Sequence, residues 1–266
     1  MLFRSECWGA GHGHPVPSYT HAEERPAFLQ RMTTGMHARN KDFAVFTEGL
    51  HDSVLDTVGM FHACQPSAFM GDVNALKASR ASARAEAEPY PEIFRYTFPE
   101  LVSTTRNPTP MTLRSFVNYA AVFGLRHEIE IRYMPDRTYA LEGKVPTKAD
   151  YGEVKNLPSL AAMHAEPPDV ASAYMKAVGD FQREHAKYLL RGKFVDDEGF
   201  TAANGIVAKR FVAADGTSAV CVWNVADKPV SVAIDGLGGP KRVFAPAREG
   251  ADGTLAADSI RLYVFE

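Results

Sequence analysis

The feature that most constrains the fold is a single change in the spacing of apolar residues near Gly199. Before it, short apolar runs alternate with stretches of helical periodicity, which predicts parallel strands covered by helices. After it, short β-branched segments separated by turn residues predict a small antiparallel sandwich. We therefore predict an α/β chain, with a partial or complete (β/α)8 TIM-type barrel in residues 1–198 and an all-β sandwich in residues 199–266.

The predicted elements follow this division. Strands are expected at residues 1–8, 42–49, 92–100 and 128–133, and helices at 22–38, 52–61, 113–123 and 170–190. The sandwich strands are expected at 205–212, 219–225, 230–234, 242–244 and 259–265, with Asp215 and Gly216 in a hairpin turn. A sandwich of this size is small for an independent domain, so we expect it to pack on the preceding segment.

Charge and motifs exclude several classes of function. The net charge is −3 and the basic residues are scattered, so neither nucleic acid nor a membrane surface is an expected partner. The three cysteines have no zinc-ribbon or disulfide-framework spacing. Dinucleotide, Walker and G-x-S-x-G motifs are absent from the sequence, and we expect no cofactor.

Three glutamates stand at the carboxyl ends of predicted strands, where ligands bind in parallel β/α folds. Glu48, after the apolar run from Phe43 to Phe46, is the strongest candidate, because a dry environment raises the pKa of a carboxyl group. Glu6 and Glu100 are the other two catalytic candidates. The alternatives are a helix cap or an arginine pair for Glu48, and a pair with Arg106 for Glu100.

A glycine-rich turn after the first predicted strand carries possible substrate contacts. Its His12 and His14 could hydrogen-bond sugar hydroxyls, and Trp8 and Tyr19 could stack on a sugar ring. Arg106 completes the predicted substrate-binding set. The two histidines could instead bind a metal ion, for which the tempting further ligands are His51, His62 and Asp136.

The order of these segments resembles poorly characterised bacterial glycoside-hydrolase-like barrel proteins with a carboxy-terminal β-sandwich. The resemblance rests on short motifs in residues 7–15, 45–49, 94–100, 118–124, 222–224 and 261–263. It implies a (β/α)8 catalytic domain that hydrolyses glycosidic bonds with acidic residues at strand ends.

The chain is short for that architecture, because a complete barrel of this kind needs about 250 residues before its sandwich. We therefore expect the second half of a barrel, with its amino-terminal half missing. Exposed strand edges would then invite a homo-oligomer or the missing half as a partner. The sequence shows no signal peptide or membrane helix, which leaves a cytoplasmic location or, for a truncated chain, a secreted or periplasmic one.

The leading hypothesis is a glycoside hydrolase that uses Glu48 with Glu6 or Glu100 on a carbohydrate substrate. Two alternatives remain open at this point: a metal-dependent hydrolase using His12 and His14, and a non-catalytic carbohydrate-binding or interaction fragment.

Overall fold

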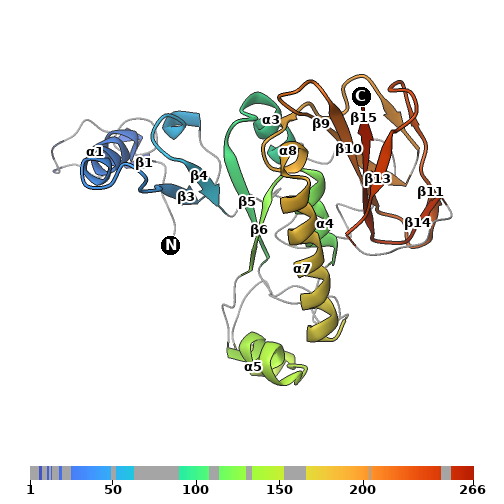
Figure 1. Cartoon of the computed structure of the whole chain (residues 1–266). Helices are drawn as coiled ribbons and strands as arrows, with labels where there is room; N and C mark the ends of the chain where they lie inside the picture. Colours follow the sequence, from blue (N-terminus) through green and yellow to red (C-terminus); the bar gives the residue numbers. More distant parts are fainter. Residues whose placement is uncertain are drawn as a thin grey trace. The chain divides into compact units, whose positions relative to one another are not determined.

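The computed structural model describes residues 6–7, 11, 13, 18–19, 25–48, 52–62, 90–107, 114–129, 134–152, 166–203, 205–246 and 253–266. The chain divides into two compact units, Met1–His62 and Ala63–Glu266. Figure 1 shows the order of the elements along the chain.

The first unit contains a short parallel strand pair covered by a helix. Helix α1 (Arg25–His37) precedes β3 (Phe46–Glu48), and the 3-10 helix η2 (Asp52–Val54) leads to β4 (Met60–His62). Strands β3 and β4 pair in parallel. Strands β1 (Glu6–Cys7) and β2 (Ser18–Tyr19) form a separate antiparallel pair. Side chains of α1 hold it against this unit, because the Thr33 hydroxyl donates to the Thr57 carbonyl at 3.2 Å.

The second unit begins with strand and helix alternating. Helix α3 (Tyr90–Thr97) leads to β5 (Val102–Asn107), α4 (Arg114–Val122) and β6 (Arg126–Ile129). Strands β5 and β6 pair in parallel. The remaining helices of this part are α5 (Met134–Glu142), the 3-10 helix η4 (Lys148–Tyr151), α7 (Pro168–Glu184) and α8 (Ala186–Leu189).

The second unit ends in antiparallel sheets. Five strands are hydrogen-bonded in the order β13-β15-β10-β9-β7. They are β7 (Lys193–Phe194), β9 (Ile206–Val212), β10 (Ser218–Asn224), β13 (Arg242–Phe244) and β15 (Ile260–Phe265). Two small pairs join β8 (Thr201–Ala202) to β12 (Ile234–Asp235) and β11 (Val230–Ser231) to β14 (Thr254–Leu255).

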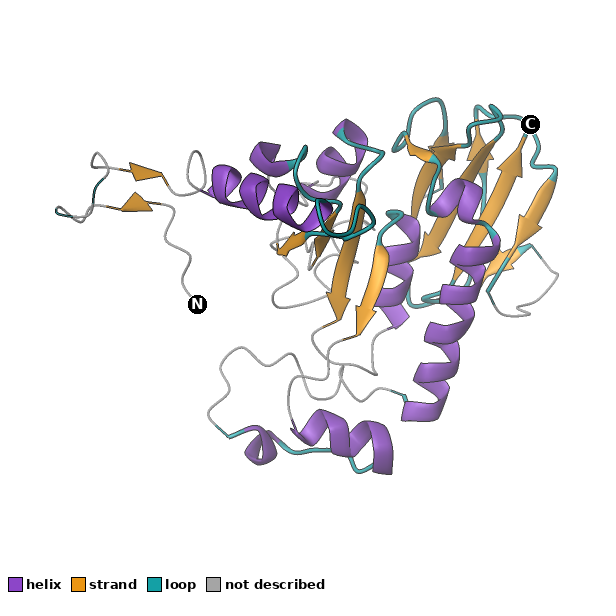
Figure 2. Cartoon of the chain, turned by 60° about the vertical axis from the view of Figure 1, so that its left-hand side comes forward, coloured by secondary structure: helices purple, strands orange, loops and turns teal. Residues whose placement is uncertain are grey.

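Both faces of the central strand β10 are buried. Because successive side chains of a strand point to opposite faces, β10 contributes to two separate cores. Cys221 and Trp223 join a core that also contains residues of α4, α7 and α8, whereas Val220 and Val222 join a second core with Leu255 on the opposite face. Figure 2 shows α4 lying between the β5–β6 pair and the sheet, in agreement with the contacts of α4 to both. The sandwich therefore packs on the preceding helices, as expected.

The coarse architecture matches the prediction, with parallel strand pairs and helices followed by antiparallel sheets. Helices at 22–38, 113–123 and 170–190 and the main sandwich strands are confirmed. The hairpin turn at Gly216, with φ of 82°, is also confirmed. The boundary near residue 199 stays a prediction, because the core of the second unit runs across it.

Two predicted elements are wrong. Residues 92–100 do not form a strand, because Tyr90–Thr97 is helix α3. Its buried residues Phe94 and Arg95 are neighbours in sequence, whereas a half-buried strand would bury every second residue. Residues 52–61 do not form one helix. Only η2 is helical there, and the Gly59 amide donates to the Val45 carbonyl at 2.8 Å, which brings the chain into β4 beside β3.

Candidate functional site

The first unit places an acid and an imidazole at the ends of neighbouring parallel strands. Glu48 is the last residue of β3, His62 is the last residue of β4, and the two are partners in the strand register. Arg25, at the start of α1, donates a hydrogen bond to the hydroxyl of Thr47 at the same end of β3. This end of the strand pair therefore combines a carboxylate, an imidazole and a guanidinium.

The two faces of this strand pair differ in exposure. Thr47 and Phe61 are buried, with exposed fractions of 8% and 0%, whereas Phe46 is 55% exposed and Glu48 is exposed as well. The rings of Phe46 and His62 meet edge to face at 5.4 Å. Because side chains alternate along a strand, Glu48 shares its face with the exposed aromatic ring. An aromatic ring beside a carboxylate is a suitable surface for a sugar.

The second unit has a comparable edge at the ends of β5 and β6, which we call the carboxyl edge. Arg106 of β5 and Glu128 of β6 are partners in the parallel register close to this edge. Helix α4 returns to the start of β6, where the Leu125 amide donates to the Ala120 carbonyl at 2.8 Å. Since α4 runs back toward the amino end of β6, its first residue, Arg114, lies at the carboxyl edge.

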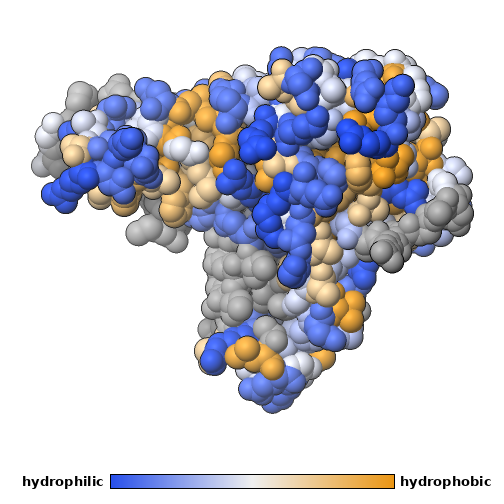
Figure 3. All heavy atoms as spheres, in the orientation of Figure 1, coloured by the Kyte–Doolittle hydropathy of each residue, from blue (hydrophilic) through white to orange (hydrophobic). Residues whose placement is uncertain are grey.

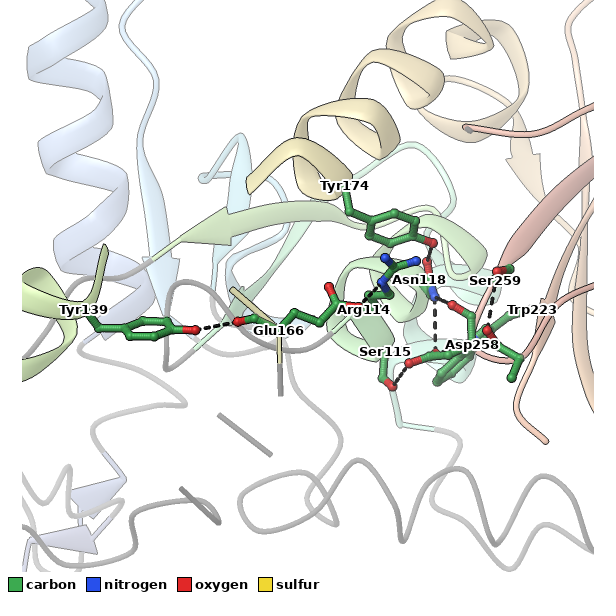
Figure 4. Close-up of polar contacts among 10 residues, drawn as sticks. Arg114, Ser115, Asn118, Tyr139, Glu166, Tyr174, Trp223, Asp258 and Ser259 are labelled. Atoms are coloured by element: carbon green, nitrogen blue, oxygen red, sulfur yellow. Dashed lines mark hydrogen bonds and ion pairs between the residues drawn. The ribbon is translucent and has the colours of Figure 1, made fainter. Parts of the chain in front are cut away.

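Arg114 is held by two neighbours in the second unit (Figure 4). Its Nε lies 2.5 Å from Oε1 of Glu166, and its guanidinium carbon lies 4.3 Å from the centre of the Tyr174 ring. The Tyr139 hydroxyl donates to the Glu166 carbonyl at 2.5 Å. Burial and the neighbouring Asp169 and Glu166 raise the pKa of Tyr139, so its hydroxyl stays a donor at neutral pH.

Behind Arg114, a polar network joins α4 to the sandwich. The Tyr174 hydroxyl donates to the Asn118 side chain at 2.6 Å, and the amide of Asn118 donates to the Asp258 carbonyl at 2.7 Å. Ser115 and Trp223 donate to the Asp258 carboxylate at 2.7 and 2.8 Å. Asp258 has φ of 51°, a backbone conformation that its several side-chain and main-chain contacts stabilise.

Buried polar side chains also occur along β5 and β6. Ser103, Thr104 and Thr105 are at most 4% exposed, and within the described residues their hydroxyls have no hydrogen-bond partner. The same holds for both ring nitrogens of His127, and burial lowers the pKa of His127 to about 4. His127 is therefore neutral at physiological pH. Unpaired buried polar groups cost stability, and such costs concentrate at functional positions.

One shallow pocket of about 310 Å³ lies beside α3, lined by Ile93, Tyr96, Asp196, Asp197 and Glu198. The Tyr96 hydroxyl donates to Glu198, and this hydrogen bond raises the pKa of Tyr96. Because α3 precedes β5, the pocket is on the side of the strand pair where stabilising rather than catalytic residues are expected.

The predicted catalytic residues have different outcomes. Glu48 lies at a parallel strand end, as predicted. The expected dry environment is wrong, because Glu48 and the preceding Phe43 and Phe46 are all exposed. Glu6 lies in the antiparallel pair opposite Tyr19, so the rule for parallel strand ends does not select it. Glu100 is exposed in the turn between α3 and β5, at the amino end of β5 rather than the carboxyl end of a strand. The helix at α3 removes the reason for choosing Glu100.

The predicted substrate-binding residues are only partly described. Trp8, His12 and His14 lie outside the described residues, as does His51. Tyr19 belongs to β2, and Arg106 belongs to β5 near the carboxyl edge. Asp136, one of the tempting metal ligands, is buried and accepts a hydrogen bond from Tyr151 at 2.7 Å. In the described part of the chain, no cluster of three or more His, Cys, Asp or Glu residues is arranged to hold a metal ion.

Sequence reasoning missed Glu128, Arg114 and Glu166. Glu128 was assigned to the start of a strand at 128–133, whereas β6 is Arg126–Ile129 and Glu128 lies near its carboxyl end. The available signal for Arg114 was its place just before the apolar face of the helix that follows β5. No sequence signal pointed to Glu166, because it pairs with Arg114 across 52 residues of sequence.

None of the helices in the described residues combines the length and hydrophobicity that a bilayer crossing requires.

Comparisons with known proteins support the fold but give no family. No protein-family model matches the chain, and no curated protein matches it in sequence. Among solved structures, Amy13B of Eubacterium rectale matches with a TM-score of 0.58 and 12% identity, over 91% of this chain and 56% of that chain. The noncanonic maltogenic α-amylase AmyB of Thermotoga neapolitana matches with a TM-score of 0.50 and 8% identity, over 96% of this chain and 57% of that chain.

The chain thus spans little more than half the length of these two structures. At such low identity the likeness concerns the fold alone. The architecture of parallel strands, covering helices and antiparallel sheets is shared with part of each of these two structures.

Proposed function

We propose that this chain is part of a glycoside hydrolase in which Glu48 is a catalytic carboxyl group. The observation that carries the proposal is the pairing of Glu48 with His62 at the ends of two parallel strands. Ligands bind at this end of the strands in parallel β/α folds. The likeness to part of two solved structures, one of them a maltogenic α-amylase, supports the choice of a carbohydrate substrate.

Glycoside hydrolysis requires two carboxyl groups, one that donates a proton to the leaving oxygen and one that acts as nucleophile or base. Glu48 is proposed for one of these roles. His62, at the same strand end and beside the Phe46 ring, provides a hydrogen-bond donor that can orient a carboxylate or a sugar hydroxyl. Glu6, from the sequence prediction, is the candidate for the second role.

Turnover by the Glu48→Gln variant tests the proposal. Glutamine keeps the shape of the side chain but neither donates a carboxylic proton nor acts as a nucleophile, so kcat should fall by about 10³-fold or more on a glycoside that the wild type hydrolyses. Glu142→Gln is the matched control, because Glu142 is an exposed glutamate at the end of α5. Its kcat should equal that of the wild type.

The same assay on Glu6→Gln tests Glu6 as the second acid, and this variant should show a comparable loss. Full activity of Glu48→Gln would refute the assignment of Glu48. Sugar binding by the wild type without hydrolysis of any glycoside in a panel of α- and β-linked substrates would refute the proposed reaction.

A further inference from the structure

Building on the proposed function, we propose that Arg114 and Glu166 form a subsite that binds two neighbouring hydroxyl groups of a neutral sugar. The pair lies at the carboxyl edge, where Arg114 opens helix α4. Arg114 would donate to one hydroxyl oxygen, and Glu166 would accept from the next hydroxyl. Figure 4 shows the two side chains directed toward each other, with Tyr174 over the guanidinium.

The orientation of Arg114 is fixed before any ligand arrives. Glu166 occupies its Nε at 2.5 Å, and the Tyr174 ring covers one face of its guanidinium at 4.3 Å. Within the described residues, its terminal Nη atoms have no hydrogen-bond partner. The side chain is 30% exposed. A guanidinium held in place loses little conformational entropy when it binds a ligand.

The neighbours of Arg114 are themselves anchored. The Tyr174 hydroxyl donates to Asn118 at 2.6 Å, and Asn118 donates to the Asp258 carbonyl at 2.7 Å. The main chain at Glu166 is held by the Tyr139 hydroxyl at 2.5 Å. A site supported in this way by a second layer of hydrogen bonds keeps the geometry that selective binding needs.

The charges of the pair favour a neutral ligand. Arg114 and Glu166 compensate each other, so the subsite attracts neither an anion nor a cation strongly. Glu166 is 26% exposed, and its Oε2 has no partner among the described residues, so it remains an acceptor. A donor and an acceptor side by side match two adjacent hydroxyls of a sugar ring, each of which can both donate and accept.

Titration of the whole chain with sugars tests the subsite. The probes are methyl α-glucopyranoside, methyl α-galactopyranoside and, as an anionic comparison, glucuronate. We expect at least one neutral glycoside to bind, and Arg114→Gln and Glu166→Gln each to weaken its binding by about tenfold or more. Arg114→Lys should weaken it too, because lysine keeps the charge but lacks the fixed fork of donors.

Arg183→Gln is the matched control. Arg183 forms an exposed pair with Asp180 on α7, and Figure 3 shows both hydrophilic and apolar side chains along this helix. Its loss should leave sugar affinity within about twofold of the wild type, because it breaks an exposed pair away from the carboxyl edge. Thermal unfolding of each variant checks that the fold is retained, and Glu166→Gln keeps the proposal testable if Arg114→Gln fails to fold.

Three results would overturn this inference: no binding of either neutral glycoside, unchanged affinity in both Arg114→Gln and Glu166→Gln, or tighter Arg114-dependent binding of glucuronate. The proposed reaction is judged separately by the hydrolysis assay on Glu48→Gln. Loss of hydrolysis in that variant with unchanged affinity in the Arg114 and Glu166 variants would reject the subsite alone. Arg114-dependent binding without hydrolysis by the wild type would reject the reaction alone.

Discussion

Two parts of the second unit treat buried polar groups in opposite ways. In the sandwich, the fully buried Asn224 donates to the carbonyls of Lys228, Leu255 and Ala256, each at 2.9 Å, and accepts from the Ala226 amide. In the β5–β6 pair, the buried Thr105 hydroxyl and both ring nitrogens of His127 have no hydrogen-bond partner in the described part of the chain.

This difference distinguishes buried polar groups that stabilise the fold from buried polar groups that cost stability. A buried amide with all its hydrogen bonds made stabilises the fold, whereas a buried hydroxyl without a partner costs free energy. Positions that cost stability are expected where another requirement constrains the sequence. Here they lie on the two strands that lead to the carboxyl edge, which supports the location of the proposed subsite.

The largest effect should follow from Asn224→Ala. The change leaves three carbonyls, of which that of Leu255 is buried, and one amide without their partner, so the free energy of unfolding should fall by roughly 3–5 kcal/mol. Urea unfolding measures this. Lys228→Ala is the control, because its side chain is exposed and it keeps the carbonyl that Asn224 binds. A loss below about 1 kcal/mol for Asn224→Ala would contradict the claim that the hydrogen bonds of Asn224 stabilise the sandwich.

The next effect is a pH dependence at His127. Its pKa is lowered from 6.5 to about 4 in the folded chain, so folding favours the neutral ring. The resulting stability is complete above pH 6.5 and is lost as the pH falls from 6.5 to 4, by roughly 3 kcal/mol. His127→Leu should remove this part of the slope when unfolding is measured between pH 4 and 7. Equal slopes for wild type and variant would show that His127 is not buried in the neutral form.

Substitution of Gly124 tests the packing between the end of helix α4 and the sheet. It has φ of 64°, and an added Cβ would lie 2.7 Å from Cε1 of Phe211 in the sheet. Gly124→Ala should therefore lower the free energy of unfolding by roughly 2–3 kcal/mol. Gly143→Ala is the control, with φ of 68° and no atom within 4 Å of an added Cβ. Its cost should be about 1 kcal/mol, and equal losses for both variants would indicate that α4 does not pack tightly on the sheet.

The smallest effect has the opposite sign. Thr105→Val replaces a fully buried hydroxyl that has no partner in the described residues with a methyl group of similar size. We expect the free energy of unfolding to rise by about 1 kcal/mol, measured by urea unfolding. Thr47→Val in the first unit is the contrast, because the Thr47 hydroxyl accepts a hydrogen bond from Arg25. Destabilisation by Thr105→Val would mean that its hydroxyl is satisfied.

The sequence predicted elements whose apolar pattern is local. Helix α4 and strand β10 show their periods directly, and Glu48 could be placed at a strand end because an apolar run precedes it. Helix α3 was missed because Ile93, Phe94 and Tyr96 favour strands by propensity. In the structure this segment is helical, and the buried Arg95 donates hydrogen bonds to the carbonyls of Pro99 and Leu101 at 3.0 and 2.8 Å.

The carboxyl edge could not be predicted because its contacts join distant segments. Arg114 meets Glu166, and Asn118 meets Asp258 across 140 residues of sequence. The motif at 118–124 and Trp223 were noticed in the sequence as marks of a family resemblance. In the structure, Asn118 and Trp223 both bond to Asp258, so their physical role is to join the helices to the sandwich.

Chemical rescue of Glu48→Ala tests the central claim most directly. Removing the carboxylate should abolish hydrolysis of a glycoside with an activated leaving group, and added azide or formate should restore turnover by filling the vacated position. Glu142→Ala should keep full activity and show no response to these anions. Restored turnover in Glu48→Ala alone is the result predicted here. Wild-type activity in Glu48→Ala without any added anion would contradict the account.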